Sequence, residues 1–480
     1  MMKIALVMVM VMFLCGAEAS IGINWGRESA QRLVPSQVVD LLLQNGIGRA
    51  RLYSAQTDIV AAFEGSGINL TITINNPSAI KSRESATAWI KAKEFYFNRC
   101  NIKSIFLFGY VFLNGMKGGL GPLIKALESQ RLLQDVLNER GFGHIKVNFP
   151  HIDMELVSNV TKPSESDFYD IIKPHMIQHL QFLRENNAPF QVESIPIINA
   201  ALNNFDPSFA FPGNASTQVI KDTNGAVYTN IVEWQYDSYV WALEKLNFSD
   251  IRVDYSMLGW PTDGYTGANF SSAEYFYKHL LPWVSSDKGT PKRPGHPINV
   301  NVHSLTDEHK MLLSYPFARH WGIYRSNGQP KYKIDLSGQG RDMYPTTVRG
   351  IMHMPNRWCA FNGERRDIGK VRAQLERACI GSDCTSTYPG ASCSSLTFEQ
   401  NITYAFNMYF QFQFQDEKSC DFEGLGHVVV NDPSTDACVF PVEVVKGQQV
   451  NFMPKNSGRA FRPSTAFFCF SIFLFFYLSM

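Results

Sequence analysis

The 480-residue sequence has almost no excess of charge of either sign, with 44 Lys and Arg against 43 Asp and Glu. Because nucleic acids and other polyanions are bound by basic surfaces, this balance argues against such a partner. Cysteine is scarce over most of the chain, since Cys100 stands alone between the N-terminal apolar run and residue 359. No glycine-rich phosphate loop follows the first expected strand, which argues against a nucleotide-binding protein.

What the sequence does contain is a regular alternation of short β-branched runs and helical stripes. Eight strands alternating with helices predict a parallel (β/α)8 barrel, although an open doubly wound sheet would show the same alternation. The expected strands lie at residues 21–26, 47–53, 68–74, 102–108, 145–149, 190–198, 251–257 and 298–305. The expected helices lie at residues 35–45, 58–63, 85–97, 120–139, 168–185, 227–246 and 272–281.

Both ends of the chain carry processing signals. Residues 1–19 have the basic, apolar and small-residue regions of a secretory signal peptide, so the mature chain is expected to begin at Ser20. The apolar C-terminal run, residues 466–480, is shorter than the roughly 20 residues of a membrane span. With the polar spacer before it, it predicts a GPI signal, residues 458–480, that is removed and leaves the lipid on Asn456 or Ser457. A short tail-anchor helix is the alternative.

Secretion and a lipid anchor place the protein outside the cell, on the outer face of the plasma membrane or in the cell wall. Six Asn-x-Ser/Thr sequons agree with an exported chain and predict glycosylated surface loops. The sequon asparagines are Asn69, Asn159, Asn214, Asn247, Asn269 and Asn401.

Cysteines gather near the C-terminus. An even cluster in an exported chain predicts a module with three disulfides, whose connectivity the spacing leaves open. A zinc site is the weaker alternative, because no histidine stands at ligand spacing, and no metal is expected. Cys100 is expected to be an unpaired, buried thiol. The clustered cysteines are Cys359, Cys379, Cys384, Cys393, Cys420 and Cys438.

Several motifs carry a family resemblance. They are Ile-Gly-Ile-Asn-Trp-Gly at 21–26, Arg-Leu-Tyr at 51–53, Gly-Trp-Pro-Thr-Asp-Gly at 259–264, Gly-Thr-Pro-Lys-Arg-Pro-Gly at 289–295 and Arg-His-Trp-Gly-Ile-Tyr at 319–324. Residues 21–335 thereby resemble plant glycoside hydrolase family 17, the endo-1,3-β-glucosidases, and the cysteine module resembles carbohydrate-binding module family 43. The expected domains are a barrel at 20–340, a linker at 341–357, the module at 358–445 and a linker at 446–457.

The resemblance implies a retaining glycosidase with two catalytic glutamates, which should lie about 5–5.5 Å apart. The sequence has neither. The family's acid position falls on Tyr110 or Val111, and the nucleophile position, two residues before Gly-Trp-Pro, is Met257. Glu193 and Asp307 are the candidate substitutes for the lost carboxylates, and Tyr110 would need an adjacent base to act as a nucleophile.

The resemblance also implies residues that could hydrogen-bond or stack on glucosyl units, each with a structural role as the alternative. They are Asn24, Tyr53, Trp260, Lys310 and Arg319.

Three hypotheses follow from the sequence. The first is a lipid-anchored, non-hydrolytic β-1,3-glucan-binding protein on a degenerate glucanase barrel. The second is an active endo-1,3-β-glucanase that uses relocated carboxylates. The third is a structural wall protein in which only the module binds. No cofactor is implied, and a monomer is expected.

Overall fold

The computed structural model describes residues 20–444, apart from residues 31, 77–78, 214–215 and 313–314. These described residues belong to one compact unit of the chain. The signal peptide, the anchor site at Asn456 or Ser457, the C-terminal apolar run and the sequon residue Asn214 lie outside the described residues. Among the helices of the described part, none is long and apolar enough to cross a membrane.

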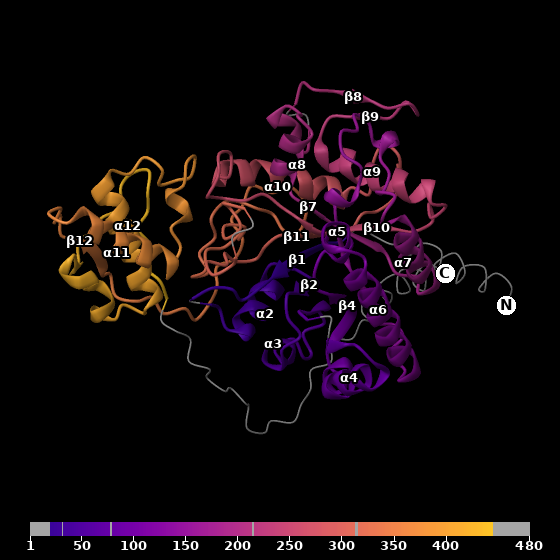
Figure 1. Ribbon diagram of the computed structural model, residues 1–480, viewed down its shortest axis with the longest axis horizontal. Coiled ribbons are helices and arrows are strands. Elements are labelled where there is room, and N and C mark those ends of the chain that lie inside the picture. Colours follow the sequence, from indigo (N-terminus) through magenta and orange to yellow (C-terminus); the bar gives the residue numbers. More distant parts are fainter. Residues whose placement is uncertain (1–19, 31, 77–78, 214–215, 313–314, 445–480) are drawn as a thin grey trace, which may run out of the picture. The chain divides into compact units, whose positions relative to one another are not determined.

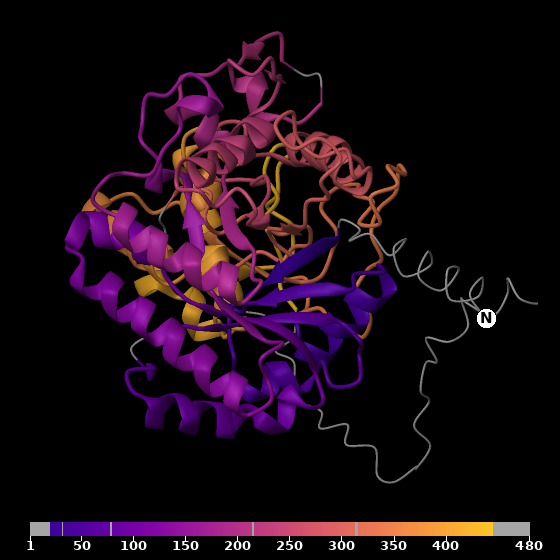
Figure 2. The same cartoon turned by 90° about the vertical axis from the view of Figure 1, so that its right-hand side faces the viewer.

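A parallel β-barrel forms the larger part of the fold (Figures 1 and 2). Its strands follow one another in the order β5-β4-β3-β2-β1-β11-β10-β7-β6. Strands β5 and β6 are two halves of one barrel position, separated by Phe149, because β5 pairs with β4 and β6 pairs with β7. The strands are β1 (Ile21–Trp25), β2 (Arg49–Leu52), β3 (Asn69–Ile74), β4 (Asn101–Leu107), β5 (Lys146–Asn148), β6 (Pro150–Ile152), β7 (Phe190–Ser194), β10 (Val253–Leu258) and β11 (Val300–Val302). The predicted (β/α)8 barrel is confirmed.

Helices connect the strands and lie around the outside of the barrel (Figure 1). Those expected from the sequence are α2 (Pro35–Gln44), α3 (Thr57–Ala61), α4 (Arg83–Phe97), α6 (Gly121–Glu139), α7 (Lys173–Glu185), α9 (Ile231–Lys245) and α10 (Phe270–Ser285). Two short α-helices and one small hairpin of the barrel domain are not predicted by the sequence pattern. These are α5 (Val111–Gly118), α8 (Pro196–Leu202) and the antiparallel pair β8 (Ile220–Lys221) and β9 (Val227–Tyr228).

Two predicted strands were too long. The strand expected over 190–198 ends at Ser194, because Pro196 occupies the first turn of α8, where its missing N–H costs no hydrogen bond. The strand expected over 298–305 pairs only from Val300 to Val302. Both strands end early at the carboxyl edge of the barrel, where the chain turns into the loops that form the barrel mouth.

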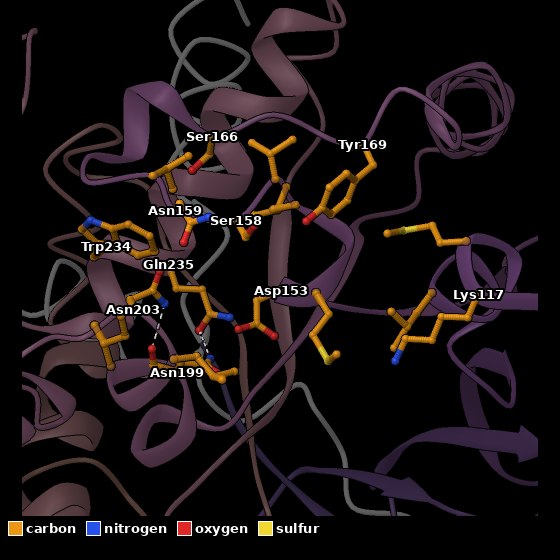
Figure 3. A pocket seen from close by; sticks show the side chains of 18 residues that line it. Lys117, Asp153, Ser158, Asn159, Ser166, Tyr169, Asn199, Asn203, Trp234 and Gln235 are labelled. Atoms are coloured by element: carbon orange, nitrogen blue, oxygen red, sulfur yellow. Dashed lines mark hydrogen bonds between the residues drawn. The ribbon is translucent and has the colours of Figure 1, made fainter.

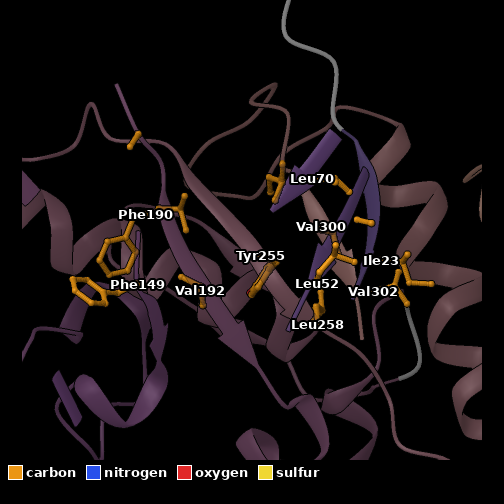
Figure 4. Close-up of a cluster of buried hydrophobic side chains, with 14 of the residues drawn as sticks. Ile23, Leu52, Leu70, Phe149, Phe190, Val192, Tyr255, Leu258, Val300 and Val302 are labelled. Carbon is orange, nitrogen blue, oxygen red and sulfur yellow. The ribbon is translucent and has the colours of Figure 1, made fainter. Parts of the chain in front are cut away.

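Alternate residues of each strand face opposite sides of the barrel wall. On β2, Ala50 and Leu52 are buried in the hydrophobic core beneath the helices, whereas the intervening Arg51 reaches into the barrel. Figure 4 shows part of this core, with Leu52 and Val302 among the labelled side chains. The outer face of the barrel wall is therefore apolar, and polar side chains are concentrated inside the barrel.

A small C-terminal module follows the barrel. It contains the antiparallel strands β12 (Trp358–Phe361) and β13 (Gly426–Val429) and the helices α11 (Ile368–Ile380) and α12 (Phe398–Phe412). Three disulfides confirm the prediction and exclude the zinc alternative, since they use all six clustered cysteines. They join Cys359 to Cys420, Cys379 to Cys384 and Cys393 to Cys438. Cys100 is buried and unpaired, as predicted.

Phe190 lies at the start of β7 and stacks on the His151 ring with 4.0 Å between centroids. Because its side chain is fully buried, Phe190→Ala should lower the free energy of unfolding by about 3–5 kcal/mol. Phe95→Ala is the matched control, since Phe95 is 55% exposed and should cost under about 1 kcal/mol. Urea unfolding followed by circular dichroism measures both. Equal effects of the two changes would contradict the packing described.

Candidate functional site

A buried ion pair crosses the interior of the barrel. The Arg51 guanidinium on β2 donates to one carboxylate oxygen of Glu193 on β7. Three strands (β1, β11 and β10) lie between β2 and β7 in the sheet, so the arginine spans the barrel rather than bonding a neighbour. Arg51 also donates to the Ser256 carbonyl on β10 at 3.3 Å. The side chains of both ion-pair partners are almost wholly buried.

Tyr110 completes this arrangement. It follows β4, and its hydroxyl donates to the second carboxylate oxygen of Glu193 at 2.6 Å. Both oxygens of Glu193 therefore accept a hydrogen bond. Burial, and then the nearby Glu193 carboxylate, raise the pKa of the Tyr110 hydroxyl well above its ordinary value. Tyr110 is therefore a neutral donor at neutral pH.

Polar side chains on neighbouring strands surround the ion pair. Asn24 on β1 donates to the Tyr53 hydroxyl at 3.1 Å and to the Ser256 carbonyl at 3.0 Å. The Tyr53 hydroxyl also lies 3.3 Å from Nδ1 of His303, whose pKa burial lowers to about 3. Asn24 is fully buried and Tyr53 is half-buried. Of these two predicted ligand residues, only Tyr53 presents accessible surface.

Met257, which the sequence predicts at the nucleophile position of the resembled family, lies in register with Glu193 on the adjacent strand. A register shift separates Met257 from Tyr255, so the strict alternation of β10 breaks there. The Met257 side chain is buried in a small apolar cluster at the carboxyl ends of the strands. This mouth cluster comprises Ile195, Met257, Ala268, Phe317 and Trp321. The predicted nucleophile position is therefore occupied by a side chain packed among apolar atoms.

Trp260 does not stand exposed at the cleft as expected. Its side chain is only 2% exposed, stacks on Phe211 at 4.2 Å between centroids, and donates from Nε1 to the Gly267 carbonyl at 3.0 Å. An aromatic ring already stacked on one face and buried has no open surface for a sugar. A role for Trp260 in ligand binding remains a prediction, but its observed position suits a core residue.

The remaining predicted residues make their contacts with other groups than Glu193. Asp307 accepts from the Lys331 ammonium at 2.6 Å and from the Gly322 N–H at 2.9 Å. Arg319 donates to the Ser382 carbonyl in the C-terminal module at 3.1 Å. Lys310 is exposed. Glu193 and Asp307 thus serve separate structural networks, and Arg319 holds the module against the barrel.

Two further site residues escaped the sequence analysis. Arg51 stands two residues before Tyr53, so strand periodicity alone would have placed it on the same inward face. Glu308 is buried beside the β1 loop, and one of its carboxyl oxygens accepts from the Glu28 N–H at 3.0 Å. Burial raises the pKa of Glu308 to about 7. No sequence signal distinguished Glu308 from its neighbour Asp307.

A separate pocket of about 360 Å³ opens among the loops that follow β4, β6 and β7 (Figure 3). Trp234 and Tyr169 supply aromatic surface there, and Asn199 lies 2.8 Å from the Gln235 amide. With its amide oxygen and nitrogen exchanged, Asn199 donates to Asp153 at 2.9 Å. Burial raises the pKa of Asp153 to about 6. Amides, a carboxyl and aromatic rings suit hydroxylated ligands, but the pocket contains none of the candidate catalytic or ligand residues.

The described sequon residues lie on accessible surface, though not all in loops. Asn159, Asn247 and Asn269 are exposed. Asn69 begins strand β3 and Asn401 lies within helix α12, so the expectation that every sequon marks a loop was wrong for these two.

Comparison with known proteins identifies the two parts of the chain. The model of "Glycosyl hydrolases family 17" matches residues 21–336, and that of the "X8 domain" matches residues 357–427. Glucan endo-1,3-beta-glucosidase 8 of Arabidopsis thaliana is 34% identical over 444 residues, covering 90% of this chain and 91% of the relative. Glucan endo-1,3-beta-glucosidase 5 of the same plant is 32% identical over 437 residues, covering 88% of each chain.

Among solved structures, the β-1,3-glucanase and pollen allergen CJP38 of Cryptomeria japonica superposes with a TM-score of 0.62 and 26% identity. The match covers 66% of this chain and 99% of that chain. A plant β-glucan endohydrolase structure superposes with a TM-score of 0.57 and 25% identity, covering 65% of this chain and 99% of the other.

The cross-barrel ion pair yields a stability prediction. Arg51→Met leaves the Glu193 carboxylate buried without its charged partner, which should cost about 3–5 kcal/mol of unfolding free energy. Arg83→Met is the matched control, because the Arg83–Glu139 pair is half exposed and should cost under about 1 kcal/mol. Denaturant unfolding of both variants measures the difference. A loss for Arg51→Met no larger than the control's would show that the buried pair does not stabilise the barrel.

Glu308 yields a pH prediction. Its pKa of about 7 lies above the ordinary value of 4.5, so the folded state binds more protons than the unfolded state between these values. Ionisation of Glu308 therefore lowers the free energy of unfolding, by an amount that grows as pH rises from 4.5 to 7. Glu308→Gln should remove this cost and make the protein more stable than the wild type at pH 8, by on the order of 2 kcal/mol. Unfolding free energies at pH 4.5 and 8 test this, and an equal difference at both pH values would refute it.

Proposed function

Because this chain belongs to glycosyl hydrolases family 17 and carries an X8 domain, we propose that it binds β-1,3-glucan without hydrolysing it. Its relatives named glucan endo-1,3-beta-glucosidase support this choice of ligand. The matched ranges also support the proposed division into a barrel, residues 20–340, and a carbohydrate-binding module, residues 358–445.

The proposed lack of hydrolysis rests on the residues that occupy the two predicted catalytic positions. Retaining glycosidases need a nucleophilic carboxylate and an acid/base carboxyl on opposite sides of the scissile bond. Met257 packs among apolar side chains at the first position, and neither Tyr110 nor Val111 supplies a carboxyl at the second. The mouth of the barrel retains hydrogen-bonding groups for sugar hydroxyls, such as Tyr53, but loses the groups that break the bond.

The second candidate function is hydrolysis by relocated groups, and one contact favours it. The Tyr110 hydroxyl is 2.6 Å from Glu193, the distance expected between a tyrosine nucleophile and its general base. Two features weigh against this reading. Glu193 is already held in an ion pair by Arg51, and the raised pKa of Tyr110 disfavours the phenolate. Asp307, the other substitute, is paired with Lys331 and belongs to a different network.

The cellular setting forms part of the same proposal. The N-terminal signal and the C-terminal GPI signal would place a monomeric, glycosylated protein on the outer face of the plasma membrane, with its lipid on Asn456 or Ser457. The barrel and the module would then face the wall polysaccharide. We expect neither a cofactor nor a metal to take part in this function.

The test uses the purified secreted chain, residues 20–456. It should be retained by insoluble β-1,3-glucan in a pull-down assay and should release no reducing ends from soluble β-1,3-glucan during prolonged incubation. A family member that has both catalytic glutamates serves as the positive control for release.

Glu193→Gln and Glu417→Gln distinguish the two candidate functions. Glu417 lies in the module with its side chain 75% exposed, so its change is a neutral control. Release of oligosaccharides that Glu193→Gln abolishes and Glu417→Gln leaves intact would establish the active enzyme. Lack of retention by the glucan would reject the binding proposal itself.

A further inference from the structure

A cavity of about 520 Å³ lies between the barrel and the C-terminal module. The barrel contributes the loops after β10 and β11, which carry Thr262, Asp307 and His309. The module contributes Tyr404 of α12 and the acidic residue Glu443, among others. The volume is within the range of about 300–1,000 Å³ that is usual for small-ligand sites.

Specific contacts hold the two walls of this cavity together. The His320 ring lies 2.6 Å from the Thr385 hydroxyl, and Arg319 pairs with Asp383 at 3.3 Å. The Ser392 hydroxyl donates to the Asp263 carboxylate at 2.6 Å. These contacts are between barrel and module, so the module is seated on the loops that border the barrel mouth.

Two buried polar atoms of the cavity wall have no hydrogen-bond partner among the described residues. They are Nδ1 of His309 and one carboxylate oxygen, Oδ2, of Asp383. Nδ1 of His309 is 4.0 Å from the Glu443 carboxylate, and Oδ2 of Asp383 is 3.5 Å from the His320 ring. These separations are too long for good hydrogen bonds. Because an unpaired buried polar atom is costly, both atoms call for a ligand group that can donate and accept.

The charges of the wall narrow the class of ligand. Asp307 pairs with Lys331, and Asp383 pairs with Arg319. Burial acts to raise the pKa of Asp383, but the cationic neighbours outweigh it and hold that pKa below its ordinary value. The wall also carries Asp263 and Glu443 together with Arg325, so charges of both signs line it and favour neither an anion nor a cation strongly. The hydroxyls of a neutral sugar, in contrast, both donate and accept. Tyr404 and Phe270 add aromatic surface to the lining.

We propose that this cavity is a saccharide site built jointly by the barrel and the module, which takes a glucosyl segment of a β-1,3-linked glucan. The inference rests on the proposed glucan-binding function and assigns part of that binding to the junction. The loop that supplies Thr262 and Asp263 begins directly after β10, the strand of Met257. The junction site therefore adjoins the barrel mouth, and one glucan chain can contact both.

Two conservative substitutions remove hydrogen-bonding groups from the cavity while keeping its packing. His309→Phe retains the ring that stacks on Phe412, and Tyr404→Phe retains the edge contact with Phe440. Tyr409→Phe is the matched control, because Tyr409 lies on the same helix and packs against Phe422, outside the cavity lining. Thermal unfolding of each variant confirms that the fold is intact.

The experiment measures binding of a linear β-1,3-glucohexaose to the secreted chain by isothermal titration calorimetry. The double change His309→Phe/Tyr404→Phe should weaken binding about tenfold, and Tyr409→Phe should leave it unchanged. Hydrogen exchange should show hexaose-dependent protection of residues 383–393 and 437–443 in the wild type, with that protection lost in the double variant.

The outcomes separate the two proposals. Binding by the wild type that the double variant keeps in full, without protection at the junction, overturns the junction site and leaves glucan binding intact. No binding of hexaose or of long glucan by the wild type overturns both proposals. If Tyr409→Phe also loses hexaose binding, the weaker binding of the double variant comes from damage to the module core. This result would overturn the junction site.

Discussion

The Arg51–Glu193 ion pair is the interaction on which the barrel mouth depends. It links β2 to β7 across the barrel interior, and through Ser256 and Tyr110 it also ties in β10 and the loop after β4. A buried charge is tolerated only when it is paired and its remaining hydrogen-bonding sites are filled. Glu193 meets both conditions, since each of its carboxylate oxygens accepts a hydrogen bond.

The rest of the mouth is consistent with a site that has exchanged chemistry for packing. Met257 joins Ile195, Phe317 and Trp321 in an apolar cluster at the place where a nucleophile would stand. In the loop beyond β10, the Trp260 side chain is buried in the core, and the Asp263 carboxylate accepts a hydrogen bond from the module. This loop thus helps to hold the barrel and the module together, and it contributes Thr262 and Asp263 to the cavity between them.

The fold could be predicted from the sequence because strand and helix periodicities are local. The alternation of apolar runs predicted the barrel, with a doubly wound sheet as the alternative. The even cysteine count predicted the disulfide module over a zinc site, although not the disulfide connectivity. Predictions failed where contacts with residues distant in the sequence determine the local structure. Pro196 shortens β7 by starting a helix, and Trp260 is buried because Phe211 lies against it. The partner of Glu193 could not be read from the chain, since Arg51 reaches it only across a closed barrel.

The most direct test of the central claim, that Glu193 and Tyr110 support structure rather than bond cleavage, is covalent trapping. The secreted chain is incubated with an activated 2-deoxy-2-fluoro-β-glucosyl donor, which accumulates the glycosyl-enzyme of a retaining glycosidase, and its intact mass is measured. We expect the mass to remain unchanged, with a glutamate-bearing family member labelled in parallel. An adduct of one glycosyl unit on Tyr110 or Glu193 would contradict the account.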